Sequence, residues 1–151
     1  MEIHHILTPT DFSAHAKQAV TAAFELGQTF GAKLSLLHVI EVPAYAIEVS
    51  LPLEELERDA RHELALLLPE AEAAHVDVTR LVELGVPYQR ILETATAEQV
   101  DLIVMATHGR TGLGHLVLGS VAERVLRLAP CPVLTIRPLG ERAGDMRTIV
   151  I

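Results

Sequence analysis

Four glycines fall within one fifteen-residue segment, ATHGRTGLGHLVLGS (106–120), which follows the apolar run DLIVM (101–105) and leads into a helical pattern. A connection that only reverses the chain does not need so many glycines, and long loops of this kind are usually functional. Glycine backbone approaches a ligand closely, and the free N–H groups at a helix N-terminus favour anions. The small residues are spaced as A-x2-G-x9-G-S, with Ala106, Gly109 and Gly119-Ser120 at the fixed positions. We interpret the segment as a phosphate-binding loop, with plain turn chemistry as the alternative.

Two common phosphate motifs do not fit this loop. A Walker A loop requires a lysine before its serine or threonine, and Gly119-Ser120 has none between them. A dinucleotide fingerprint requires G-x-G-x-x-G after the first strand, whereas GLG (112–114) continues with His-Leu-Val after the fourth apolar run. Ser120 has a second explanation, because Ser120 and Glu123 match the S-x-x-E capping box. A serine at this place can serve either the helix or a phosphate.

The elements that must position this loop alternate along the chain. The apolar runs IHHILTP (3–9), KLSLLHV (33–39), DVTRLVE (77–83), DLIVMA (101–106) and PVLTIR (132–137) predict strands. The segments between them carry apolar stripes of helical period: Ala16, Ala19, Val20, Ala23, Phe24 and Phe30; Leu53, Leu56, Ala60, Leu64 and Leu67; Ile91, Leu92 and Ala95. A fourth helix is expected from Ser120 to the Pro130 that stops it.

This alternation predicts an α/β fold of one doubly wound, five-stranded parallel sheet, in the order 3-2-1-4-5, with helices on both faces. We expect one domain over 1–138 and a tail over 139–151, in which RTIVI (147–151) is a candidate extra strand. Strands one and four are neighbours at the switch point, where open sheets bind ligands beyond the carboxyl ends of their strands. The segments TPTDFS (8–13) and THGRTGLGHLVLGS (107–120) are therefore expected to form the site.

At these residues the chain resembles the universal stress protein family, in ILTPTDFS (6–13), GVPYQRILETA (85–95) and the stretch from Asp101 to Arg137. In the ATP-binding branch of that family the loop reads G-x2-G-x9-G-[ST], so Ala106 stands at the first glycine. The resemblance implies a Rossmann-like fold, related to the adenine nucleotide alpha hydrolases, and a site for ATP, with Mg²⁺ or Mn²⁺ held by the phosphates. The implied site comprises Pro9, Thr10, Asp11, Val39, Ala106, Thr107, His108, Gly109, Arg110, Thr111, Gly112, Gly119, Ser120 and Val121.

Within that site the resemblance places Asp11 near the ribose and Val39 at the adenine. From its position alone, Asp11 could equally cap the first helix, a role for which Ser13 is as well placed. Arg110 is either a solvated loop charge or a phosphate partner.

Composition restricts the remaining possibilities. A formal net charge of -8 opposes non-specific binding to nucleic acid or anionic lipid. Cys131 is the only cysteine in the sequence, so it forms no intramolecular disulfide, and it is expected to be a buried, unreactive thiol. No apolar run approaches a membrane span, and the start lacks a signal-peptide pattern, so a cytoplasmic protein is expected. The eight histidines show no zinc-ligand spacing. The acidic residues 54–59 are expected to form the solvated face of a helix.

The family resemblance, together with the glycine-rich loop, implies a regulatory protein of the stress response that binds ATP and changes its binding to an unidentified protein partner. Two alternatives stay open: a slow ATPase or nucleotidyl-transfer enzyme on the same fold, and an interaction protein that binds no nucleotide. We find no catalytic residues, because no general base or positioned lysine is evident near the phosphates. A homodimer is expected through 132–137, an apolar strand at the edge of the predicted sheet, and the family resemblance implies the same. Alternatively, the tail segment RTIVI (147–151) covers that edge within the same chain.

Overall fold

The computed structural model of the chain describes residues 2–42, 52–69, 74–108, 118–137 and 148–150. The predicted order 3-2-1-4-5 is confirmed, and a sixth strand continues the sheet, giving β3-β2-β1-β4-β5-β6. The elements are β1 His5–Pro9, α1 Ala14–Phe30, β2 Lys33–Ile40, α2 Leu53–Ala65, β3 Val78–Leu84, α3 Pro87–Ala97, β4 Leu102–Ala106, α4 Ser120–Leu128, β5 Val133–Ile136 and β6 Thr148–Val150. The first five strands pair with one another in parallel, and β6 is antiparallel to β5.

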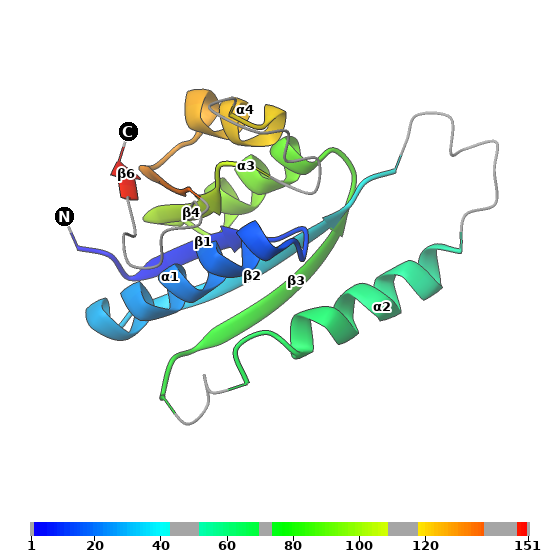
Figure 1. Cartoon of the computed structure of the whole chain (residues 1–151), viewed down its shortest axis with the longest axis horizontal. Helices are drawn as coiled ribbons and strands as arrows, with labels where there is room; N and C mark the ends of the chain where they lie inside the picture. The colour runs from blue at the N-terminus through cyan, green and yellow to red at the C-terminus, as the bar shows by residue number, and fades with distance from the viewer. Residues whose placement is uncertain (1, 43–51, 70–73, 109–117, 138–147, 151) are drawn as a thin grey trace.

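Two apolar layers, one on each face, hold the helices on the sheet, with α1 and α2 on one side and α3 and α4 on the other (Figure 1). Successive side chains of a strand point to opposite faces, so Ile6 of β1 joins the layer under α1 and Leu7 joins the layer under α3 and α4. Both residues are fully buried. Burial on both faces explains why the strands appear in the sequence as continuous apolar runs.

Three residues of the predicted helix stripes lie differently from expectation. Phe30 is the last residue of α1 and is 49% exposed, directly before the left-handed Gly31 that ends the helix. Leu67 lies beyond the end of α2, which stops at Ala65. Leu56 is 40% exposed, because α2 is buried against the sheet only through its later residues, Ala60 and Leu64. The periodicity identified the right face of each helix but not where contact with the sheet ends.

The far edge of β5 carries the antiparallel strand β6, with Thr135 opposite Ile149. Two outcomes were expected for the edge at 132–137: pairing with a second chain, or cover by the tail of the same chain. This structure has the second, because β6 of the tail covers the edge of β5.

Candidate functional site

A cavity of about 790 Å³ opens at the carboxyl ends of the central strands, where β1 and β4 are neighbours. Its volume is within the range of small-molecule sites. Ten residues that the sequence assigned to the site line it together: Pro9, Thr10, Asp11, Val39, Ala106, Thr107, His108, Gly119, Ser120 and Val121. The remaining four, Gly109, Arg110, Thr111 and Gly112, lie outside the described residues.

The turn after β1 presents Asp11 at this cavity. Ser13 is the N-cap of α1, because its hydroxyl accepts the N–H of Ala16 at 3.1 Å. Asp11 Oδ1 instead accepts the N–H of Ser13 at 3.0 Å, closing a local turn. Of the two candidates for capping, Ser13 takes the role, and Asp11 lies on the cavity wall beside Thr10.

The two ends of the glycine-rich segment are joined by a backbone hydrogen bond. Gly119 N–H donates to the carbonyl of Thr107 at 2.8 Å, and Thr107 N–H donates to the carbonyl of Ile136 at 3.1 Å. A Cβ on Gly119 would lie 3.1 Å from the Thr107 oxygen, although the φ of Gly119 is an ordinary −63°. The requirement for glycine here is thus close backbone approach rather than a left-handed conformation.

The N-terminus of α4 opens into the cavity. Gly119, not Ser120, is the N-cap: its carbonyl accepts the N–H of Glu123, and no side chain caps this end. The capping box predicted for Ser120 and Glu123 is therefore absent, because Ser120 already lies inside the first turn. The exposed Ser120 lines the cavity with helix N–H groups beside it, an arrangement that favours an anion.

His108 lies at the start of the glycine-rich segment and brings a polar atom to the same place. Its Nδ1 is 2.9 Å from the Thr107 hydroxyl. Its Nε2 is buried and has no hydrogen-bond partner among the described residues. Buried polar atoms are rarely left unpaired, so this nitrogen marks a position where a polar ligand atom is favoured.

The charges on the described walls are all negative. Asp11, Glu41, Asp59 and Glu63 line the cavity, and no lysine or arginine among the described residues does so. Asp59 comes from the acidic segment 54–59 that the sequence assigned to solvent, whereas the sequence analysis did not single out Glu63. The exposed Leu56 lines the cavity beside these two α2 carboxylates. Their membership in the site could not be read from the sequence, because it depends on where α2 leaves the sheet. Phe12, which lies within the expected segment TPTDFS, also lines the cavity, and His38 is a further lining residue that the sequence did not suggest.

Other features of the described chain contribute no second site of this kind. A smaller hollow of about 470 Å³ between the end of α2 and β3 contains none of the predicted residues. Within the described residues, no group of three histidines, cysteines or acids is placed to hold a metal ion. Burial raises the pKa of the Cys131 thiol, which makes it less reactive. None of the helices in the described parts of the chain is long and apolar enough to cross a membrane.

The sheet order, the two helix layers and the cavity at the switch point define an open, doubly wound α/β domain. Residues 2–137 match the model of the universal stress protein family, and the chain belongs to that family. Universal stress protein MJ0531 of Methanocaldococcus jannaschii is 36% identical over 141 residues, which cover 87% of this chain and 81% of the relative. A relative from Thermus aquaticus is 38% identical over 140 residues, covering 87% and 97% of the two chains.

Among solved structures, that of MJ0577 superimposes with a TM-score of 0.82 at 29% identity, covering 93% of this chain and all of the other. Two more distant family structures contain nucleotides. One is a complex with cAMP, with a TM-score of 0.71 at 23% identity over 89% of this chain and 97% of that one. The other, from Archaeoglobus fulgidus, is a complex with dAMP, with a TM-score of 0.66 at 19% identity over 89% and 98%.

Proposed function

We propose that this protein binds ATP in the cavity at the carboxyl ends of β1, β2 and β4 and acts as a regulatory module in a stress response. The observation that carries the proposal is the joining of three features in one cavity: the Asp11 turn, the Thr107–Gly119 backbone contact and the N-terminus of α4. The complexes of two family members with cAMP and dAMP support an adenine nucleotide as the ligand.

In this arrangement the phosphates lie at the N-terminus of α4 and the base lies toward Val39 of β2. Helix N–H groups and the close approach allowed by Gly119 suit phosphate oxygens, and His108 Nε2, which has no hydrogen-bond partner among the described residues, offers a further contact. The acidic walls repel a polyphosphate, so a divalent cation held mainly by the phosphates is expected to accompany ATP. When bound, that ion would supply neutralising charge.

Calorimetric titration with ATP and GTP tests this proposal. We expect micromolar binding of ATP in the presence of Mg²⁺ or Mn²⁺, and weaker binding of GTP. Mass spectrometry of nucleotide released from protein purified without added ligand gives an independent check. If ATP produces no heat and competes with no other nucleotide up to millimolar concentration, the interaction-protein alternative takes its place.

The enzymatic alternative is tested on the same sample. No lysine or arginine among the described lining residues is placed to stabilise a departing phosphate, so we expect at most slow release of ADP or AMP. Turnover of many equivalents per minute would identify an enzyme.

We also propose a homodimer through 132–137, as the family resemblance implies. In this structure β6 pairs with β5, so the dimer requires β6 to leave or to exchange with the partner's β6. Sedimentation of the full chain and of a chain ending at Arg137 tests this step. If both the full chain and the shortened chain sediment as monomers, the dimer proposal is overturned. If only the shortened chain forms a dimer, β6 blocks the edge in the full chain.

A further inference from the structure

The turn that presents Asp11 contains a residue in an unfavourable backbone conformation. Phe12 has a φ of 65°, in the left-handed region that a bulky side chain rarely adopts. Such a conformation costs about 1–2 kcal/mol and persists only where surrounding contacts hold it.

Part of the restraint comes from within the turn. Phe12 N–H donates to the Thr10 hydroxyl at 3.1 Å, and Ser13 N–H donates to Asp11 Oδ1 at 3.0 Å. Both bonds join residues two positions apart and are partly buried. Because they lie within the turn, they hold its shape but not its position relative to the sheet.

Two contacts tie the turn to β2. Thr10 N–H donates to the carbonyl of Leu37 at 2.8 Å, and the second tie comes from the side chain of His38. Its Nδ1 is 2.8 Å from the carbonyl oxygen of Thr10, and because a carbonyl only accepts, Nδ1 carries the proton and donates. The same imidazole ring lies against Phe12, with ring centroids 4.4 Å apart and planes inclined by 30°. His38 thus contacts the residue before Asp11 and the residue after it.

We propose that His38 is a positioning residue that holds the Asp11 carboxylate in place for the ribose hydroxyls of the bound nucleotide. This inference rests on the proposed function, since it assigns a role within the ATP site. Both side chains line the cavity, so a shift of the turn moves Asp11 relative to any ligand. His38 is suited to the role because one side chain supplies both a flat ring for Phe12 and a donor for Thr10.

The two contributions are separable by substitution. His38→Phe keeps a flat ring but removes the donor and leaves the Thr10 carbonyl without this partner. His38→Asn keeps a donor near the position of Nδ1 but removes the ring. The exposed His62 of α2, which does not line the cavity, provides a matched control in His62→Asn.

The test compares the affinities of ATP and 2′,3′-dideoxy-ATP, which lacks both ribose hydroxyls. In the wild type we expect ATP to bind at least about tenfold more tightly, the usual effect of a hydrogen bond to a charged group. The ratio of the ATP affinity to the dideoxy-ATP affinity falls toward one in His38→Phe and in Asp11→Asn. His38→Asn keeps part of the wild-type ratio, and His62→Asn leaves the ratio unchanged. The double variant Asp11→Asn with His38→Phe adds little further loss, because the two residues act through one contact.

The ratio separates positioning from general destabilisation, which weakens both ligands equally. Urea unfolding of each variant establishes that it is folded in the assay. If the wild type binds neither ligand, the proposed ATP site fails. If the wild type shows the preference and His38→Phe keeps it, the positioning role alone is overturned.

Discussion

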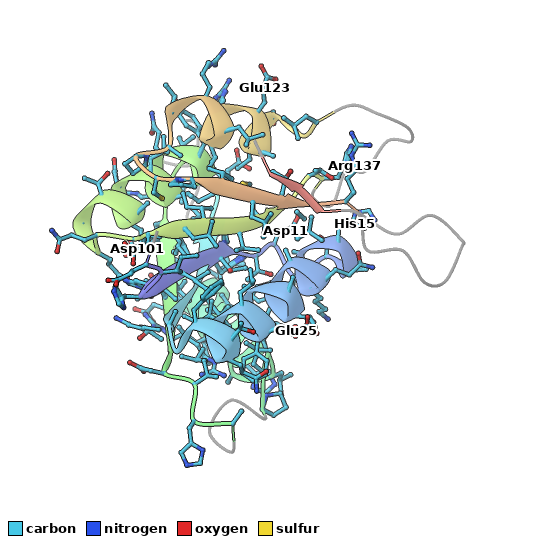
Figure 2. The ribbon with its side chains drawn as sticks, turned by 90° about the vertical axis from the view of Figure 1, so that its left-hand side faces the viewer. Asp11, His15, Glu25, Asp101, Glu123 and Arg137 are labelled. Atoms are coloured by element: carbon cyan, nitrogen blue, oxygen red, sulfur yellow. The ribbon has the colours of Figure 1, made fainter. Side chains whose placement is uncertain are left out.

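The two ends of the parallel sheet use polar side chains in opposite ways. Figure 2 shows Asp101 at one end of the sheet and Asp11 at the other. At the amino end, polar groups bond to one another across three elements and line no cavity that we find among the described residues. At the carboxyl end, polar groups surround a cavity of about 790 Å³. One end closes the fold and the other is available to a ligand.

The network at the amino end is centred on His5 of β1. His5 Nδ1 donates to the Glu98 carbonyl at 3.1 Å, and Nε2 is 2.8 Å from the hydroxyl of the fully buried Ser35. Ser35 in turn donates to the Glu98 carboxylate at 3.0 Å. The network joins β1, β2 and the end of α3, segments that are far apart in the sequence.

The comparison predicts that substitutions at one end change ligand binding and those at the other change stability. Gly119→Val at the carboxyl end has the largest expected effect, a loss of ATP affinity of more than about 100-fold, or 2.7 kcal/mol. The Cβ would meet the Thr107 carbonyl oxygen at 3.1 Å, and the added branches displace the backbone that borders the phosphates. Calorimetry measures the loss.

Gly119→Ala is the graded control and is expected to lie between the wild type and Gly119→Val. Because φ at Gly119 is −63°, neither variant is strained by its own conformation, and both are expected to unfold at nearly the wild-type urea concentration. A large loss of stability with unchanged affinity would contradict the assignment of this end to the ligand.

His5→Ala at the amino end is expected to lower the free energy of unfolding by about 2 kcal/mol, the scale for breaking a buried hydrogen-bond network. Its neighbour offers a matched control, because the His4 side chain is 74% exposed and its Nε2 lies 3.3 Å from the exposed carboxylate of Glu2. His4→Ala should change stability by less than about 0.5 kcal/mol. Urea unfolding gives both values, and ATP affinity should stay unchanged in both variants.

The sequence predicted the fold better than it predicted either polar end. Apolar runs and helical periods are local, and they located all five parallel strands and the switch point. The sheet order predicted that TPTDFS (8–13) lies at the switch point, and the family resemblance implied the individual site residues. The roles of His5 and His38 depend on contacts with residues 26 or more positions away, from His38 to Phe12 at the least. The sequence alone does not distinguish His5 and His38 from the other six of its eight histidines, because their partners are brought beside them only by the folded sheet.

At the amino end, Asp101 gives the stability of the protein a dependence on pH that can be measured. Its carboxylate accepts the N–H groups of His4 and His5 at 2.8 and 3.0 Å. The His4 hydrogen bond is the main cause that holds the pKa of Asp101 below its ordinary value. A carboxyl with a lowered folded-state pKa stabilises the protein above its unfolded pKa of about 3.9, and this contribution is lost as the pH falls through the folded value.

Asp101→Asn is therefore expected to cost about 1 kcal/mol at pH 7, a modest value because the group is partly exposed. The difference from the wild type should shrink as the pH is lowered below about 4. Urea unfolding at pH 7, 5 and 3 measures it. A difference that stays constant over this range would mean that the ionised form of Asp101 contributes nothing to stability.

Ala106 provides the smallest expected effect at the carboxyl end. It stands where the family pattern has its first glycine, yet it is the last residue of β4, paired with Ile136 in extended backbone. Alanine adopts that conformation without strain, so the position demands a small side chain rather than a glycine. Ala106→Gly should change ATP affinity by less than about tenfold, or 1.4 kcal/mol. If the wild type binds no ATP and Ala106→Gly does, the added methyl group blocks the nucleotide, and the natural protein acts through contacts that do not involve one.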